Sequence, residues 1–174
     1  MFYALMIDNN GNGIGSHAYQ EEPSSYPSNE ISCTLAQAQS PMAYQIVNGQ
    51  IVESLSYAKT SQIAVLQSAF QQAEQASVSI TMASGVTAAF GMTPHDWTKI
   101  VGLYSKYVAK GVSIPTGYQI PDASGVLQAV TVADIENLFD AGEDQLNGAL
   151  IKLSTLVGQV EACTTVSAAQ AIVF

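Results

Sequence analysis

The side chains that could most readily bind a ligand or a metal ion lie close together near the N-terminus. Asp8, Asn10, Asn12 and Gly13 match the first, third, fifth and sixth positions of a calcium-binding loop, where oxygen ligands alternate before a glycine. The twelfth position of such a loop is a bidentate glutamate, and here it is Tyr19. The same run of Asp, Asn and Gly also supplies the positive-φ residues of a tight turn. The missing glutamate favours a hairpin turn over a calcium site.

The other reactive residues do not form a catalytic or metal-binding pattern. The glycine-rich run 11–16 has the wrong spacing for a phosphate-binding loop, and no lysine follows it. His17 and His95 are the two histidines of the chain, too few for a zinc site. His95 and Asp96 are neighbours at an expected helix start, so their side chains point in different directions. We therefore predict a non-enzymatic protein that needs no metal and no cofactor.

The charge of the chain argues against nucleic acid as a partner. Five lysines and no arginine stand against 14 acidic residues, which gives a net charge of -9 over 174 residues. Binding to phosphates requires a basic patch, and the lysines are scattered. Anionic membranes are disfavoured for the same reason, and no apolar run approaches the ~20 residues of a membrane span. Cys33 and Cys163 are expected to be free, mostly buried thiols.

The elements that must position these residues begin with a small β-rich unit over residues 1–55. Strands are expected at 2–7, 14–19, 44–47 and 50–53. Residues 30–34 form either a short strand or the lead into the helix-prone run 35–39. Asn48-Gly49 between two β-prone runs predicts a hairpin with a type I′ turn.

Helical periodicity dominates from residue 56 onwards. Helices are expected at 57–76, at 93–110, from Thr131 over a long apolar stripe, and at 168–174, with hairpins at 78–90 and 117–130. Thr131 with Asp134 three residues later resembles a capping box. The near-heptad stripe of the long helix predicts packing on another helix or self-association. The sequence thus predicts an α+β protein with a β-rich domain at 1–55 and a mainly helical domain at 56–174.

Aromatic side chains are the candidates for partner contacts. Polar faces rich in Gln and Ser, few charges and many tyrosines suit a protein–protein surface. Tyr19, Tyr26 and Tyr44 lie in or beside the expected N-terminal turns, so we predict that they are exposed and bind a partner. Most of the other aromatic residues are expected to pack in the core.

Residues 57–174 resemble a domain of unknown function found in tail-associated proteins of tailed phages. The shared features are an Ala/Gln-rich first helix, a short β segment, a hairpin leading into a Thr-capped long helix, and the closing run 160–174. The N-terminal unit, with its Asn/Gly turn and the run 44–52, is similar to the front of tail fibre assembly proteins. The chain departs from that family in its lack of arginine and its low charge.

The resemblance implies a tail fibre assembly chaperone, which has no catalytic residues. Such a protein binds a phage tail fibre or receptor-binding protein and assists its folding or trimerisation. It would act in the host cytoplasm during assembly, or remain on the virion tail. The alternative is a structural tail or baseplate component that is retained in the virion.

Overall fold

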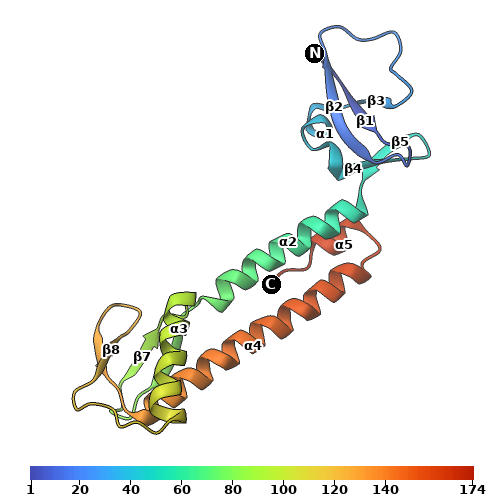
Figure 1. Ribbon diagram of the computed structural model, residues 1–174. Helices are drawn as coiled ribbons and strands as arrows, with labels where there is room; N and C mark the ends of the chain where they lie inside the picture. The colour runs from blue at the N-terminus through green and yellow to red at the C-terminus, as the bar shows by residue number, and fades with distance from the viewer. The chain divides into compact units, whose positions relative to one another are not determined.

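The computed structural model describes every residue from Met1 to Phe174 and is an α+β protein, as predicted (Figure 1). The chain forms two compact units, Met1–Leu66 with Leu156–Val173, and Gln67–Thr155 with Phe174. Both units take part of the two long helices, α2 (Leu55–Glu74) and α4 (Val132–Ala162). The change from strands to helix does fall between Glu53 and Leu55. That 1–55 and 56–174 are separate domains stays a prediction.

The first unit is built on a three-stranded antiparallel sheet in the order β2-β1-β3. Its strands are β1 (Phe2–Ile7), β2 (Gly13–Tyr19) and β3 (Glu30–Cys33). The central strand contributes Ala4 and Leu5 to the core, both fully buried. Asp8 accepts hydrogen bonds from the backbone N–H groups of Asn10 and Asn12, each at 2.8 Å. The side-chain amide of Asn12 also donates to Asp8, and this hydrogen bond is the largest cause of the lowered pKa of the Asp8 carboxyl. The Asp8 carboxylate therefore stabilises the predicted hairpin turn.

A second hairpin of the first unit packs close to this sheet. Helix α1 (Leu35–Gln39) and the 3₁₀ helix η1 (Pro41–Ala43) lead into β4 (Tyr44–Val47) and β5 (Gln50–Glu53). Asn48 and Gly49 have φ values of 53° and 77°, which confirms the predicted type I′ turn. Gly13 lies against the backbone of η1, where a Cβ atom would come within 2.0 Å of the carbonyl oxygen of Pro41. Only glycine allows this approach.

The first unit also contains the start of helix α2 and the end of helix α4. Helix α2 starts at Leu55, two residues earlier than predicted, because the Ser54 hydroxyl accepts a bond from the Tyr57 N–H. The Nζ atom of Lys59 donates to the carbonyl oxygen of Glu161 at 2.7 Å, in the last turn of α4.

The terminal helix α5 spans Val166–Gln170, so the prediction of 168–174 is wrong at both ends. The Thr165 hydroxyl caps it by accepting from the Ala168 N–H. The carbonyl of Ile172 accepts from the side chain of Gln62 at 2.6 Å, which holds the chain after α5 outside the helix.

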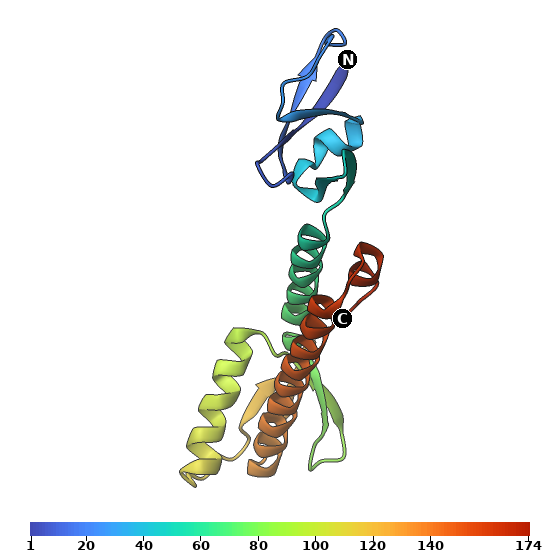
Figure 2. The same ribbon diagram turned by 90° about the vertical axis from the view of Figure 1, so that its right-hand side faces the viewer.

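The second unit packs two hairpins, one short helix and the first half of α4 around a single core. The hairpins are β6–β7 (Val78–Thr81, Thr87–Phe90) and β8–β9 (Gln119–Pro121, Leu127–Ala129). The short helix is α3 (Pro94–Leu103), and Figures 1 and 2 show it beside the N-terminal part of α4. The core residues are Val78, Ile80, Met82, Ala88, Phe90, Met92, Ile100, Tyr107, Val130, Ile135 and Leu138.

Helix α3 begins as predicted but does not continue as an α-helix to Lys110. The Thr93 hydroxyl caps it by accepting from the Asp96 N–H. From Tyr104 to Ala109 the chain is a π-helix, η2, which ends before Gly111 at a φ of 64°. Hydrophobic periodicity does not distinguish the two helix types over six residues, so the sequence could not predict this widening.

A capping box starts α4 and also ties it to the β6–β7 hairpin. One carboxylate oxygen of Asp134 accepts from the N–H and the hydroxyl of Thr131, at 2.8 and 2.7 Å. The other accepts from the Ala83 N–H at 2.7 Å. Burial of Asp134, which is 2% exposed, would by itself raise its pKa, but these hydrogen bonds outweigh burial and lower it.

The apolar stripe of α4 is not buried along its whole length. Ile135, Leu138 and Val160 lie in the cores. Leu146 and Leu150, in the middle of the stripe, are 37% and 53% exposed. The expected continuous seam is therefore interrupted within one chain, and self-association through it stays a prediction.

Two further expectations concern the cysteine thiols and a possible membrane-spanning helix. Cys33 and Cys163 are free thiols, as predicted, but both are partly exposed rather than mostly buried. Desolvation raises the pKa of the Cys33 thiol. None of the helices combines the length and the apolar character that a membrane crossing requires.

Candidate functional site

The three tyrosines predicted as partner contacts do not form one exposed surface. Tyr19 ends β2, Tyr26 lies in the following loop, and Tyr44 opens β4 in another sheet. The rings of Tyr19 and Tyr26 pack edge to face, with centroids 5.8 Å apart. All three residues are half-buried, so the expectation that they are exposed is wrong. That they bind a partner stays a prediction.

Tyr19 and Tyr26 belong to a cluster around Glu30. The Glu30 side chain is 4% exposed. Its Oε2 atom accepts a hydrogen bond from the Tyr19 hydroxyl, and its Oε1 atom lies 2.6 Å from Nδ1 of His17. The hydrogen bond to Glu30 raises the pKa of Tyr19. Both oxygens of the Glu30 carboxylate thus contact side chains of the first unit. Sequence reasoning missed this cluster, because its members are brought together only by the pairing of β1 with both β2 and β3.

The largest cavity is a groove in the second unit. One wall is α3 with η2, the other is the β8–β9 hairpin, and the volume is about 880 Å³. That volume lies at the upper end of typical ligand sites. The buried side chains of Phe90, Ile100 and Leu138 form an apolar floor. Half-buried Leu103 and Ile120 face the groove from its two walls.

The wall formed by the β8–β9 hairpin is held by its own turn. One oxygen of Asp122 accepts from the Ser124 hydroxyl, the Ser124 N–H and the Val126 N–H, at 2.6, 2.9 and 3.0 Å. The other accepts from the side chain of Gln128. The Ser124 hydroxyl is the largest cause, and together these bonds lower the pKa of Asp122 to about 2. This groove carboxylate is therefore ionised and already hydrogen-bonded.

The groove also carries two lysines without a carboxylate partner. Lys99 and Lys106 line it, and neither has a carboxylate oxygen within 4.0 Å of its Nζ atom. The Nζ atom of Lys106 lies 4.9 Å from the ring centroid of Tyr107. Asp96, the acidic residue nearest to Lys99 in sequence, accepts the Thr93 hydroxyl at 2.6 Å. The groove thus combines an apolar floor with two lysines and two aspartates, Asp96 and Asp122.

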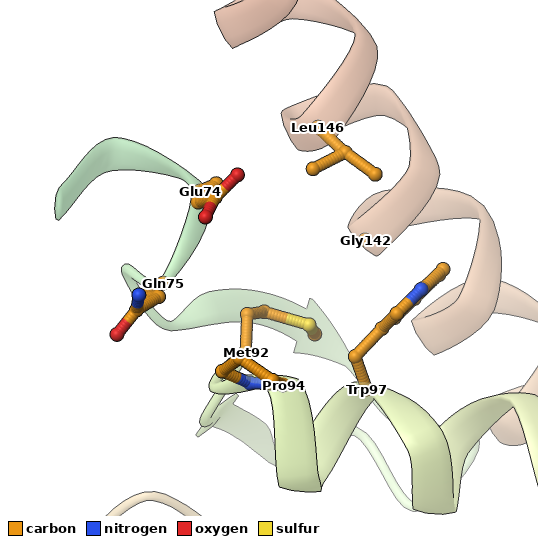
Figure 3. A pocket seen from close by; sticks show the side chains of 7 residues that line it. All are labelled: Glu74, Gln75, Met92, Pro94, Trp97, Gly142 and Leu146. Atoms are coloured by element: carbon orange, nitrogen blue, oxygen red, sulfur yellow. The ribbon is translucent and has the colours of Figure 1, made fainter. Parts of the chain in front are cut away.

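A smaller apolar pocket lies near the C-terminal end of α2 (Figure 3). Its volume of about 170 Å³ is close to that of a cavity that holds one benzene-sized group. Trp97 points toward Gly142, and Leu146 extends from the next turn of α4 (Figure 3). A Cβ atom on Gly142 would lie 2.4 Å from Cζ3 of Trp97, so the glycine is required for this contact. The lining residues are Glu74, Gln75, Met92, Pro94, Trp97, Gly142 and Leu146.

No protein-family model, no curated protein and no solved structure matches this chain.

The chemistry available to the groove is that of non-covalent binding. Its apolar floor can take apolar side chains, and its lysines can pair with carboxylates. No group of three or more His, Cys, Asp or Glu side chains is arranged to hold a metal ion. Sequence reasoning missed both cavities. Each is formed by segments far apart in the chain, and no local pattern in the sequence marks them.

Proposed function

We propose that the protein is a tail fibre assembly chaperone, which holds an apolar segment of the fibre polypeptide before the fibre trimer closes. The observation that carries this proposal is the groove of the second unit, with its open length and buried apolar floor. The resemblance of residues 57–174 to tail-associated phage proteins supports the class of partner. The groove lies within that stretch, so the resemblance and the candidate binding groove fall in the same part of the chain.

The proposed mechanism is reversible burial of apolar surface. An unassembled fibre chain exposes apolar side chains that are covered only in the trimer, and such surfaces aggregate. Side chains seated over Ile100 and Leu138 leave water, which contributes ~25 cal/mol per Å² of apolar area. A protein that binds only the unfinished state lowers the concentration of free, aggregation-prone chains. Closure of the trimer then releases the segment, because the same side chains pack against the other fibre chains.

Co-expression with a tail fibre protein from the same phage tests this function. Soluble trimeric fibre is measured with no chaperone, with the wild-type chain, and with Leu103→Gln, which places an amide in the groove wall. Leu150→Gln is the matched control, because Leu150 is 53% exposed and does not line the groove. We expect soluble trimer with the wild type and the control, and a clear loss with Leu103→Gln.

Two outcomes contradict the proposal. Fibre that becomes soluble and trimeric without this chain would remove the need for a chaperone. If the Leu103→Gln variant, with its fold verified by the emission of Trp97, yields as much soluble trimeric fibre as the wild type, the fibre does not bind in the groove. Stoichiometric amounts of the chain in purified particles, combined with the first outcome, would instead favour a structural tail component.

A further inference from the structure

The smaller pocket near the C-terminal end of α2 has one charged side chain in an otherwise uncharged wall. Its lining consists of apolar residues, the amide Gln75 and a single carboxylate, Glu74. None of the five lysines of the chain lines it, and no cationic nitrogen lies within 4.0 Å of the Glu74 carboxylate. Glu74 is half-buried. The pocket therefore holds a negative charge that no side chain of the protein balances.

The position of Glu74 adds to this negative potential. Glu74 is the last residue of α2, where the helix dipole places partial negative charge on the carbonyl groups. Basic residues are favoured at such an end, yet the last turn of α2 has none. The side-chain amide of Gln145 donates to the carbonyls of Ala73 and Ala76 but carries no charge. A cation beside Glu74 would be attracted by the carboxylate and by the helix end together.

The rest of the pocket suits an apolar stem. Met92 is buried, and Leu146 of α4 is partly exposed. The Trp97 ring stacks on Phe139 through one face, so the pocket that Trp97 lines is left to the other face and the ring edge. Figure 3 shows Glu74 across the pocket from Trp97. A ligand with a charge at one end and an apolar body can therefore place the charge at Glu74 and the body against Trp97.

We infer that this pocket binds a primary ammonium group carried on a short apolar stem, as in a lysine side chain or a free alkylamine. The volume of about 170 Å³ is close to that of a cavity that binds benzene, and a lysine side chain has about as many heavy atoms. The ammonium would pair with Glu74, and the methylene groups would pack on Met92, Trp97 and Leu146. The net charge of -9 favours the approach of such a cation. This pocket shares no residue with the groove, so the inference does not depend on the chaperone function.

Matched pairs of charged and neutral probes test the inference. Hexylamine is compared with hexanol, and the tripeptide amide acetyl-Gly-Lys-Gly with its norleucine counterpart. Binding is followed by the emission of Trp97, the single tryptophan of the chain, and by saturation-transfer NMR of the probe. We expect each charged probe to bind roughly fivefold more tightly than its neutral partner, the effect of one partly screened ion pair. Higher salt should reduce this preference.

Variants of the lining locate the preference in the pocket. Glu74→Gln should weaken the binding of both charged probes roughly fivefold and leave the neutral probes unchanged. Glu136→Gln is the matched control, because it removes the same charge from an exposed residue of α4 that does not line the pocket. Leu146→Ala should weaken charged and neutral probes alike, because it shortens the apolar wall. Neither Glu74 nor Leu146 is fully buried, so the fold should persist, and circular dichroism verifies this.

Each result supports or overturns the inference. A preference for the lysine tripeptide assigns the site to a lysine side chain of a partner, and a preference for hexylamine alone assigns it to a free amine. Equal or tighter binding of the neutral probes would show a purely apolar pocket and overturn the inference. An equal loss with Glu136→Gln would attribute the preference to net charge and overturn it as well. If no probe binds, the ammonium site does not exist. None of these results bears on the groove, which the co-expression experiment tests separately.

Discussion

The contact between Gly142 and Trp97 allows one stability prediction to be worked out in detail. In Gly142→Ala the new Cβ atom would lie 2.4 Å from Cζ3 of Trp97, and 3.2 Å from two further ring atoms. Ordinary carbon contacts are about 3.5–4.0 Å, so the ring must retreat by about 1 Å. The Trp97 ring also stacks on Phe139, with centroids 5.4 Å apart, which restricts its retreat.

The magnitude follows from two opposing effects. Overpacking of this kind costs about 1–3 kcal/mol, while replacing a helical glycine by alanine contributes about 1 kcal/mol. We expect a net loss of up to about 2 kcal/mol for Gly142→Ala. Gly148→Ala is the matched control on the same helix, because nothing lies within 4 Å of its added Cβ atom. It should gain about 1 kcal/mol, so the two variants should differ by about 1–3 kcal/mol, the cost of the overpacking.

Urea unfolding followed by tryptophan emission measures both variants. Trp97 is the single tryptophan of the chain, so its emission reports on the second unit alone. Gly142→Ala should also change the emission of the folded protein, because the ring itself must move, whereas Gly148→Ala should not. If both variants unfold at the same urea concentration with unchanged folded-state emission, the packing of Trp97 on Gly142 is not as described.

Three further predictions concern single contacts. Asp134→Asn should lower the free energy of unfolding by about 1–3 kcal/mol at neutral pH, measured in urea. The pKa of the Asp134 carboxyl is lowered in the folded state, so its contribution to stability is complete above the unfolded pKa of 3.8 and is lost as the pH falls through the folded pKa. The free energies of unfolding of wild type and variant should therefore converge in acid. Gly13→Ala should destabilise the first unit by about 3 kcal/mol in calorimetry, because backbone atoms of Pro41 block its Cβ, while Gly15→Ala on the same strand should be tolerated. Gln145→Ala removes a side-chain donor to the carbonyl oxygens of Ala73, in the last turn of α2, and of Ala76, just beyond it. It should cost about 1 kcal/mol, detected as faster amide hydrogen exchange at the end of α2.

The parts of the fold that local chemistry determines were predictable from the sequence. Asn48-Gly49 requires two positive-φ residues and makes its hairpin. Thr93 and Thr131 cap the helices that they were expected to cap. These features depend on side chains within three or four residues of the backbone groups that they satisfy. For that reason the long helices and the hairpins followed in order from the residues alone, whereas the π-helix η2 did not.

The candidate site could not be predicted, because it depends on packing between distant segments. Tyr19 ends β2 and Tyr26 lies in the loop that follows, yet both are half-buried. The pairing of β1 with both β2 and β3 brings Glu30 into contact with Tyr19, and the Tyr26 ring packs on the Tyr19 ring. The groove likewise requires α3 and the β8–β9 hairpin to face each other across a gap. A sequence pattern marks which face of a helix is apolar, but not whether a neighbouring element covers that face.

The groove is held open by contacts that do not depend on a ligand. Backbone bonding ties the β8–β9 turn to β7, where the Ala123 N–H donates to the carbonyl of Ala89 at 2.7 Å. The hydrogen bonds to Asp122 fix the conformation of the same turn. The opposite wall is anchored in the core by Ile100 and Tyr107. Since both walls are ordered before binding, a ligand does not have to supply the free energy of ordering them, and even a short segment can bind with useful affinity. The proposed chaperone function would benefit from this arrangement, because few contacts would have to be broken to release the bound segment.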